Sequence, residues 1–121
     1  MIYYTKDHEW IEIDGDTGTV GISPHAIEQL GDIVFIELPE DNTNVSQGDS
    51  IAVFESVKAA SDIYSPVTGT IIEVNTPLAD DLSSITADTS KQSWLFKIRL
   101  SDTSELDSLM DETAYNTLIA E

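Results

Sequence analysis

Cysteine is absent from the 121 residues, basic side chains are few, and no long apolar run occurs. Without cysteine there is no disulfide, no thiolate metal ligand and no thiol nucleophile, and the chain suits a reducing compartment. The longest apolar runs, such as Ile33–Ile36, hold only about four residues, too few to cross a membrane. The opening MIYYTKDHEW has the features of neither a signal peptide nor a transit peptide. We therefore expect a cytoplasmic protein without membrane association.

Positive charge is scarce as well. Five Lys and Arg stand against 23 Asp and Glu, which gives a formal net charge of −18. Such a chain repels the phosphates of nucleic acids and of anionic membranes, so neither is an expected partner. Mutual repulsion between copies also favours a monomer. The acidity serves either solubility or steering towards basic partner surfaces, and composition does not distinguish the two.

The sequence does contain a series of short β-branched and aromatic segments divided by turn residues. They predict strands at Trp10–Ile13, Thr19–Ile22, Ile33–Leu38, Ile51–Glu55, Ile63–Ser65, Thr70–Val74 and Trp94–Leu100. A mainly β fold follows, with two small antiparallel sheets packed as a sandwich or flattened barrel. The acidic, Ser/Thr-rich loop Thr76–Gln92 is expected to be irregular and exposed.

Three short helices are predicted around this β core. The first follows the second strand, with Ser23 as its N-cap and Gly31 as its end. Near the C-terminus, Ser104 is expected to cap one helix and Asp111 a second. These two would form a C-terminal helical extension over about residues 103–121.

The stretch FESVKAASDIYSPVTG places Lys58 at the tip of a hairpin between two predicted strands. Val57 before it and Ala59 after it are unusually apolar for a turn that faces solvent. No second base or phosphate-binding glycine loop accompanies the amine, so catalysis is not indicated. His8 and His25 are distant in sequence, and no metal site is predicted. Lys58 is either an ordinary surface lysine or a residue presented for modification by another enzyme.

Five blocks of sequence follow one another in a family-like order. They are YTKDHEW (Tyr4–Trp10), TVGIS (Thr19–Ser23), QLGDIVFIELPE (Gln29–Glu40), ESVKAASDIYSPVTGTIIEVN (Glu55–Asn75) and the tail LSDTSELDSLMDETAYNTLIAE (Leu100–Glu121). Together they resemble the glycine cleavage system H protein family, and the fourth block resembles its lipoyl-lysine hairpin. Biotinyl domains, with Met on both sides of the lysine, and lipoyl domains of 2-oxoacid dehydrogenases, which usually have Asp before it, match less well. The resemblance implies a lipoyl/biotinyl hammerhead in a single domain, residues 1–121.

The resemblance also implies a cofactor, partners and a function. Lys58 would carry lipoate in amide linkage, and Glu55, Val57 and Ala59 would help enzymes to recognise the tip. The chain would be a non-catalytic carrier that takes an aminomethyl group from glycine decarboxylase, a pyridoxal-phosphate enzyme. It would present that group to the tetrahydrofolate-dependent aminomethyltransferase and be reoxidised by dihydrolipoyl dehydrogenase. A lipoate-attaching enzyme would be the remaining partner.

One segment departs from the family's pattern. Where the family usually has Asn shortly before Asp-Pro-Tyr-Gly and then Gly-Trp, this chain reads ITADTSKQSWLFKI and keeps only Trp94. The altered loop, Thr86–Ser93, bears on sheltering of the lipoyl arm and on partner docking. Two alternatives therefore stay open. The chain could be an H-like lipoyl donor, relay or regulated lipoylation target outside glycine cleavage, or an unmodified acidic interaction module.

Overall fold

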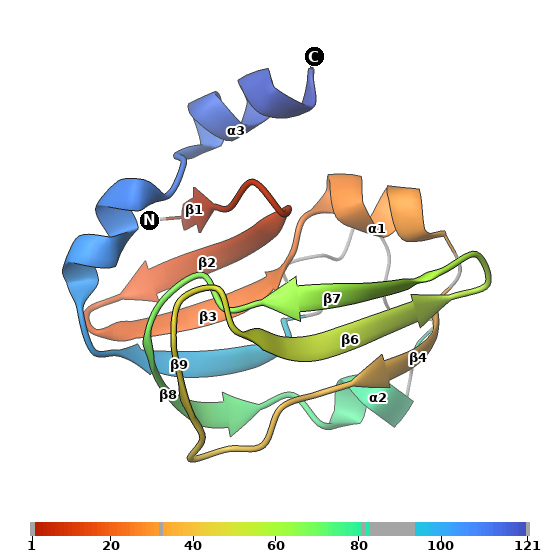
Figure 1. Ribbon diagram of the computed structural model, residues 1–121, viewed down its shortest axis with the longest axis horizontal. Helices are drawn as coiled ribbons and strands as arrows, with labels where there is room; N and C mark the ends of the chain where they lie inside the picture. Colours follow the sequence, from red (N-terminus) through yellow and green to blue (C-terminus); the bar gives the residue numbers. More distant parts are fainter. Residues whose placement is uncertain (1, 32, 81, 83–93, 121) are drawn as a thin grey trace.

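The computed structural model describes residues 2–31, 33–80, 82 and 94–120, and within them it contains two antiparallel sheets. Figure 1 shows these sheets with α1 over one end and α3 along the edge formed by β1. The larger sheet has the order β1 (Ile2–Tyr4), β2 (Glu9–Asp14), β3 (Thr17–Ile22), β9 (Phe96–Leu100), β8 (Gly69–Val74) and β5 (Asn44–Val45). The smaller sheet has the order β4 (Ile33–Glu37), β6 (Ser50–Ser56) and β7 (Ala60–Tyr64). The predicted mainly β fold with two antiparallel sheets is confirmed, and the sheets do not close into a barrel.

A single apolar core joins the two sheets. In the larger sheet Ile71 is paired with Ile98, and in the smaller sheet Ile36 is paired with Phe54. Directly opposed residues of an antiparallel pair share one face, and all four side chains belong to the same buried cluster. Strand β9 alternates as predicted, with its apolar side chains buried and Arg99 exposed. The period-2 pattern of the sequence thus fixes which face of each strand meets the core.

Three elements were not predicted from the sequence. Strands β1 and β5 are only three and two residues long, too short for a recognisable alternation. Helix α2 (Pro77–Asp80) buries Leu78, which is 5% exposed, in the core. The prediction of an irregular, exposed segment Thr76–Gln92 is therefore wrong at its start, where Pro supplies a helix-compatible φ. Most of the remainder, including the altered loop Thr86–Ser93, lies outside the described residues.

Helix α1 (Pro24–Leu30) begins and ends as predicted. The Ala26 N–H donates to Ser23 Oγ at 3.3 Å, so Ser23 is the N-cap, and Gly31 ends the helix with φ of 76°. Ile27 turns inward and is buried. Among the described residues, no helix is both long and apolar enough to cross a membrane.

The C-terminal extension contains a 3₁₀ helix, η3 (Thr103–Ser108), and an α-helix, α3 (Glu112–Ile119). Ser104 was predicted to cap the first of these, and that prediction is wrong. The cap is Asp102, whose carboxylate accepts from Ser104 N at 3.0 Å and from Ser104 Oγ at 2.6 Å. A carboxylate has enough acceptor sites for both bonds. Asp102 immediately precedes the helix, whereas Ser104 lies inside it and is itself one of the residues that need a cap. Asp111 caps α3 as predicted, accepting from Ala114 N at 2.8 Å.

Candidate functional site

Strands β6 and β7 form a hairpin that carries Lys58 at its tip. Glu55 is paired with Ala60, and the Ser56 N–H donates to the Ala59 carbonyl at 2.8 Å. Only Val57 and Lys58 lie beyond that last hydrogen bond. Figure 1 shows this hairpin reaching past α1 at one end of the smaller sheet. The structure therefore confirms the predicted hairpin and places Lys58 at its end.

The Ser56 hydroxyl organises the turn. Its oxygen accepts from the N–H groups of Lys58, at 3.2 Å, and Ala59, at 3.3 Å, and the hydroxyl donates to the Ala59 carbonyl at 3.2 Å. Among the described non-glycine residues, only His8 and Asn42 have a positive φ. The turn therefore needs neither Gly nor Asn, because a serine side chain satisfies its donors and its backbone suits any L-residue. This explains how Val and Ala can flank the lysine.

The Lys58 side chain is exposed and unpaired within the part of the chain that the structure describes. The ion pair among the described residues joins Lys97 Nζ to Glu73 at 3.9 Å. These two residues lie on β9 and β8, outside the β6–β7 hairpin. A Cβ placed on Gly31 would lie 3.9 Å from Lys58 Nζ, so the amine lies beside the end of α1. An amine that is accessible and paired with no carboxylate of the described residues fits a group attached through an amide bond at this position.

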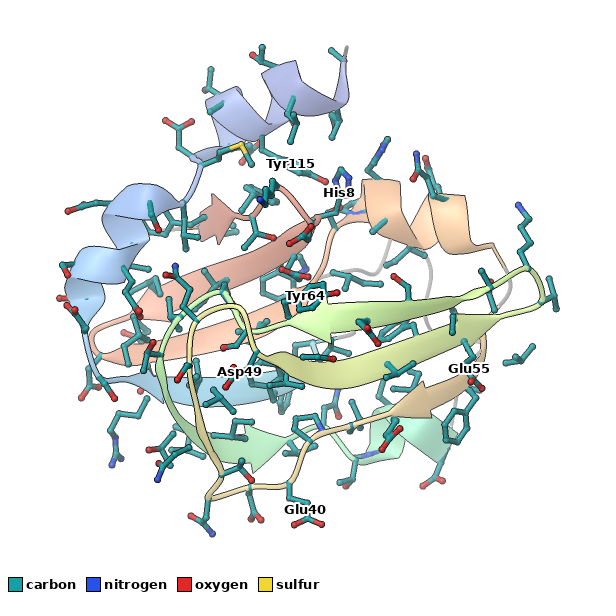
Figure 2. The ribbon with its side chains drawn as sticks, in the orientation of Figure 1. His8, Glu40, Asp49, Glu55, Tyr64 and Tyr115 are labelled. Carbon is teal, nitrogen blue, oxygen red and sulfur yellow. The ribbon has the colours of Figure 1, made fainter. Side chains whose placement is uncertain are left out.

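The three residues predicted to help recognition are all at this end of the hairpin. Glu55, Val57 and Ala59 are exposed, and Val57 is 69% exposed, although it is large and apolar. Figure 2 shows Glu55 on β6, near the tip. The geometry brings these side chains together with Lys58, and their part in recognition stays a prediction.

Sequence reasoning missed Glu9, which is a buried acid. Its side chain is 1% exposed, accepts from Thr5 Oγ1 at 2.7 Å through Oε1, and accepts from Tyr64 N at 3.1 Å through Oε2. Burial raises the pKa of the Glu9 carboxyl to about 7, against the lowering effect of these two hydrogen bonds. Glu9 also lines a cleft of about 480 Å³ that does not include Lys58. An acid at a strand start carries no sequence signal for burial, because tertiary contacts from β7 cover it.

Glu9 should make the stability of the protein depend on pH. The folded pKa of about 7 lies above the ordinary value of 4.5. The contribution of Glu9 to the free energy of unfolding is therefore fully present below pH 4.5 and is lost as pH rises towards 7. At about 1.4 kcal/mol per unit, the loss is about 3 kcal/mol. Glu9→Gln should abolish this part of the pH dependence.

Thermal unfolding of both proteins from pH 4.5 to pH 8 is the measurement. The difference between them isolates Glu9, because the other carboxylates are common to both chains. We expect Glu9→Gln to gain stability relative to the parent as pH rises. Parallel curves would show that Glu9 ionises normally in the folded state.

A second feature that sequence reasoning missed is an aromatic cluster that fixes α3 to the N-terminal strand. Tyr115 stacks on Tyr4, with ring centroids 4.4 Å apart. Its hydroxyl lies 2.6 Å from Ser23 Oγ and 2.8 Å from His8 Nδ1, and Figure 2 shows His8 and Tyr115 meeting here. His8 and His25, distant in sequence, have ring centroids 4.9 Å apart. Burial and then His25 lower the pKa of His8.

The histidine pair does not amount to a metal centre. No group of three or more His, Cys, Asp or Glu side chains suited to a metal ion occurs in residues 2–31, 33–80, 82 and 94–120. His8 is occupied with Tyr115, and His25 Nε2 lies 3.1 Å from Gln29 Nε2. Both histidines therefore belong to the packing of α1 and α3 around β1.

Comparison with known proteins identifies the family of the chain. The model of the glycine cleavage H-protein family matches residues 2–121. The chain is 50% identical over 117 residues to a glycine cleavage system H protein of Phenylobacterium zucineum, covering 97% of each chain. It is 53% identical over 117 residues to one of Dinoroseobacter shibae, covering 97% of this chain and 96% of the relative.

The fold agrees as well. The chain is similar to the crystal structure of a glycine cleavage system H protein from Mycobacterium marinum, with a TM-score of 0.88 and 37% identity. That similarity covers 99% of this chain and 97% of the other. An H protein is a carrier subunit and not a catalyst, as the sequence predicted. Over nearly its whole length, the chain belongs to the glycine cleavage H-protein family.

Proposed function

We propose that this chain carries lipoate in amide linkage on Lys58 and serves as the lipoyl carrier of the glycine cleavage system. The observation that supports the proposal is the exposed Lys58 amine on a two-residue tip, in a chain of this family. No carboxylate of the described residues pairs with the amine. The amide nitrogen would come from Nζ, which loses one proton as it bonds to the activated carboxyl carbon of lipoate.

The residues of the chain would hold and present the attachment point. When bound, the lipoyl group supplies a disulfide ring that accepts an aminomethyl group and gives it up again. Strands β6 and β7 pair along their length, from Ser50 with Tyr64 to Glu55 with Ala60. The tip is therefore carried by two paired strands and not by a long loop. A tethered group reaches its next site as an intramolecular partner, at high effective concentration.

The partners in this proposal are the enzymes that the sequence predicted. They are glycine decarboxylase, the tetrahydrofolate-dependent aminomethyltransferase, dihydrolipoyl dehydrogenase and a lipoate-attaching enzyme. A net charge of −18 would steer the carrier towards basic surfaces around their active sites. The relatives named above are bacterial, and we infer that the carrier works in the cytoplasm.

The test is to load the protein and then to assay it. The chain is incubated with a lipoate–protein ligase, lipoate and ATP, and its intact mass is measured with peptide mapping. We expect the mass to rise by one lipoyl group, confined to the peptide that contains Lys58. The loaded protein should then support glycine-dependent exchange of CO2 by glycine decarboxylase, whereas the unloaded protein should not.

Two results would contradict the proposal at different points. An unchanged mass, beside a control H protein that labels fully, would favour the unmodified interaction module. Full loading without CO2 exchange would favour a lipoyl donor or relay outside glycine cleavage.

A further inference from the structure

The carrier role leaves the outer face of the smaller sheet unexplained. Its inner face is set by the buried pair Ile36 and Phe54. The next pair along the strands, Phe35 and Glu55, must point the other way, because successive side chains alternate. Glu55 is paired in turn with Ala60 on β7. A row of three side chains therefore crosses the outer face beside the hairpin tip.

This outer face exposes unusual apolar area. Four large hydrophobic side chains are exposed among the described residues, and three of them lie on β4 or at the hairpin tip. Phe35 is 50% exposed, Val34 is 53% exposed and Val57 is 69% exposed. The pairing of β4 with β6 shifts between Ile33 and Phe35, so Val34 is the additional residue of a bulge. Bulges re-aim side chains at the edge of a sheet, and contiguous exposed apolar area marks interaction sites.

Charge on the same face is of one sign. Glu37, paired with Val53, and Asp62, paired with Val53 from the other side, form the second row of the outer face. With Glu55 they make three carboxylates, and β4, β6 and β7 contain no Lys or Arg. We call Val34, Phe35, Val57 and these three acids the outer surface. A second copy of this chain would meet like charge on it, so the complementary partner is a basic one.

We propose that the outer surface docks the enzyme that acylates Lys58, through an apolar pocket for Phe35 rimmed by Arg or Lys. The proposal rests on the proposed function. Before attachment there is no lipoyl arm to hold, so that enzyme can recognise only the protein around the tip. Phe35 on β4 is paired with Glu55 on β6, and Glu55 comes three residues before Lys58 in the sequence. A half-exposed aromatic next to a fixed target has the character of an interface anchor.

The step that this surface would support is the transfer of the lipoyl group from an acyl adenylate to Lys58 Nζ. The lipoate carboxylate attacks the α-phosphorus of ATP in the ligase, which releases pyrophosphate and gives an acyl adenylate. The bond from the acyl carbon to the phosphate oxygen breaks as the bond to Lys58 Nζ forms. AMP leaves, and the amine loses one proton to solvent. The outer surface takes no part in these bonds and serves only to bring Nζ to the activated carbon.

Phe35→Ser tests the proposal, with Leu118→Ser as its matched control. Leu118 is the fourth exposed large hydrophobic residue, at 36%, and it lies on α3 rather than on the smaller sheet. Initial rates of acylation are measured against protein concentration with a lipoate–protein ligase, lipoate and ATP. We expect Phe35→Ser to lower kcat/KM by on the order of tenfold, mainly through KM. Leu118→Ser should stay close to the parent.

Salt provides an independent readout. Acylation of the parent should slow as ionic strength rises, because a basic rim would attract the three carboxylates. Glu37→Gln should make that dependence shallower. Circular dichroism melts of every variant check that the fold is kept. If Phe35→Ser does not fold, Glu37→Gln keeps the test decisive, because an unchanged salt dependence would overturn the docking proposal.

The outcomes separate this inference from the proposed function. If the parent is acylated at Lys58 and Phe35→Ser matches it in KM, the docking proposal is overturned and the carrier proposal stands. If the parent is not acylated at Lys58, both are overturned. If loading is normal but loaded Phe35→Ser is slow with glycine decarboxylase, the surface belongs to that enzyme instead. A parent dimer that Phe35→Ser converts to a monomer would assign the surface to a second copy and overturn the proposal.

Discussion

Replacing Lys58 by Arg is expected to abolish lipoylation while the fold is unchanged. Arg keeps the positive charge, but its guanidinium does not lose a proton at ordinary pH and so offers no nucleophilic amine. The turn should survive, because Ser56 binds the backbone N–H of residue 58 rather than its side chain. Intact mass after incubation with ligase, lipoate and ATP should show no added lipoyl group. Glycine-dependent CO2 exchange should fall to the level of the unloaded protein.

The matched control is Lys6→Arg, which changes another exposed lysine in a turn. It should load like the parent, because Lys6 is not on the β6–β7 hairpin. A Lys58→Arg protein that still gains a lipoyl group at Lys6, Lys91 or Lys97 would show that the attachment site is assigned wrongly.

Gly69→Ala is expected to unfold the protein or nearly so. Gly69 begins β8 and lies between β5 and β9, paired with Val45 on one side and Leu100 on the other. A Cβ there would meet the Arg99 carbonyl oxygen and would lie 2.9 Å from the Arg99 carbonyl carbon. These are main-chain atoms in the middle of a sheet, so no rotamer change can relieve the overlap. We expect a loss on the order of 4 kcal/mol or more.

The contrasting substitution is Gly15→Ala, in the turn between β2 and β3. Gly15 has φ of 66° but nothing within 4 Å of a Cβ. Its cost should be limited to backbone strain, about 1–2 kcal/mol. Urea unfolding of the two variants and the parent is the measurement. Equal, small losses would mean that β8 and β9 can separate at Gly69 without breaking the sheet.

The hairpin and its lysine could be predicted from the sequence because their determinants are local. Period-2 alternation defines β6 and β7, and only a few residues separate them. The sequence shows that the turn around Lys58 is apolar, but it does not show the cause. Its cause is the Ser56 hydroxyl, which binds two N–H groups of the turn in three dimensions.

What could not be predicted depends on contacts between distant parts of the chain. Glu9 is buried because Tyr64, 55 residues away, donates to it. His8 and His25 meet because α1 packs next to the loop after β1. The cap of η3 was misassigned by two residues, since Asp102 and Ser104 are both good cap residues and only the backbone decides between them. Strand β1 gains its place from pairing with β2 rather than from any pattern of its own.

The cluster around Tyr115 also constrains how the protein can be made. His8 and Tyr115 are 107 residues apart, yet their side chains are hydrogen-bonded. A ribosome must therefore translate almost the whole chain before the first strand can acquire its final neighbours, and chains synthesised from the N-terminus fold in that order only where contacts are local. The β6–β7 hairpin can form earlier in translation, because its two strands are adjacent in sequence. On a nascent chain the lysine-bearing hairpin can therefore close before the amino-terminal edge is completed.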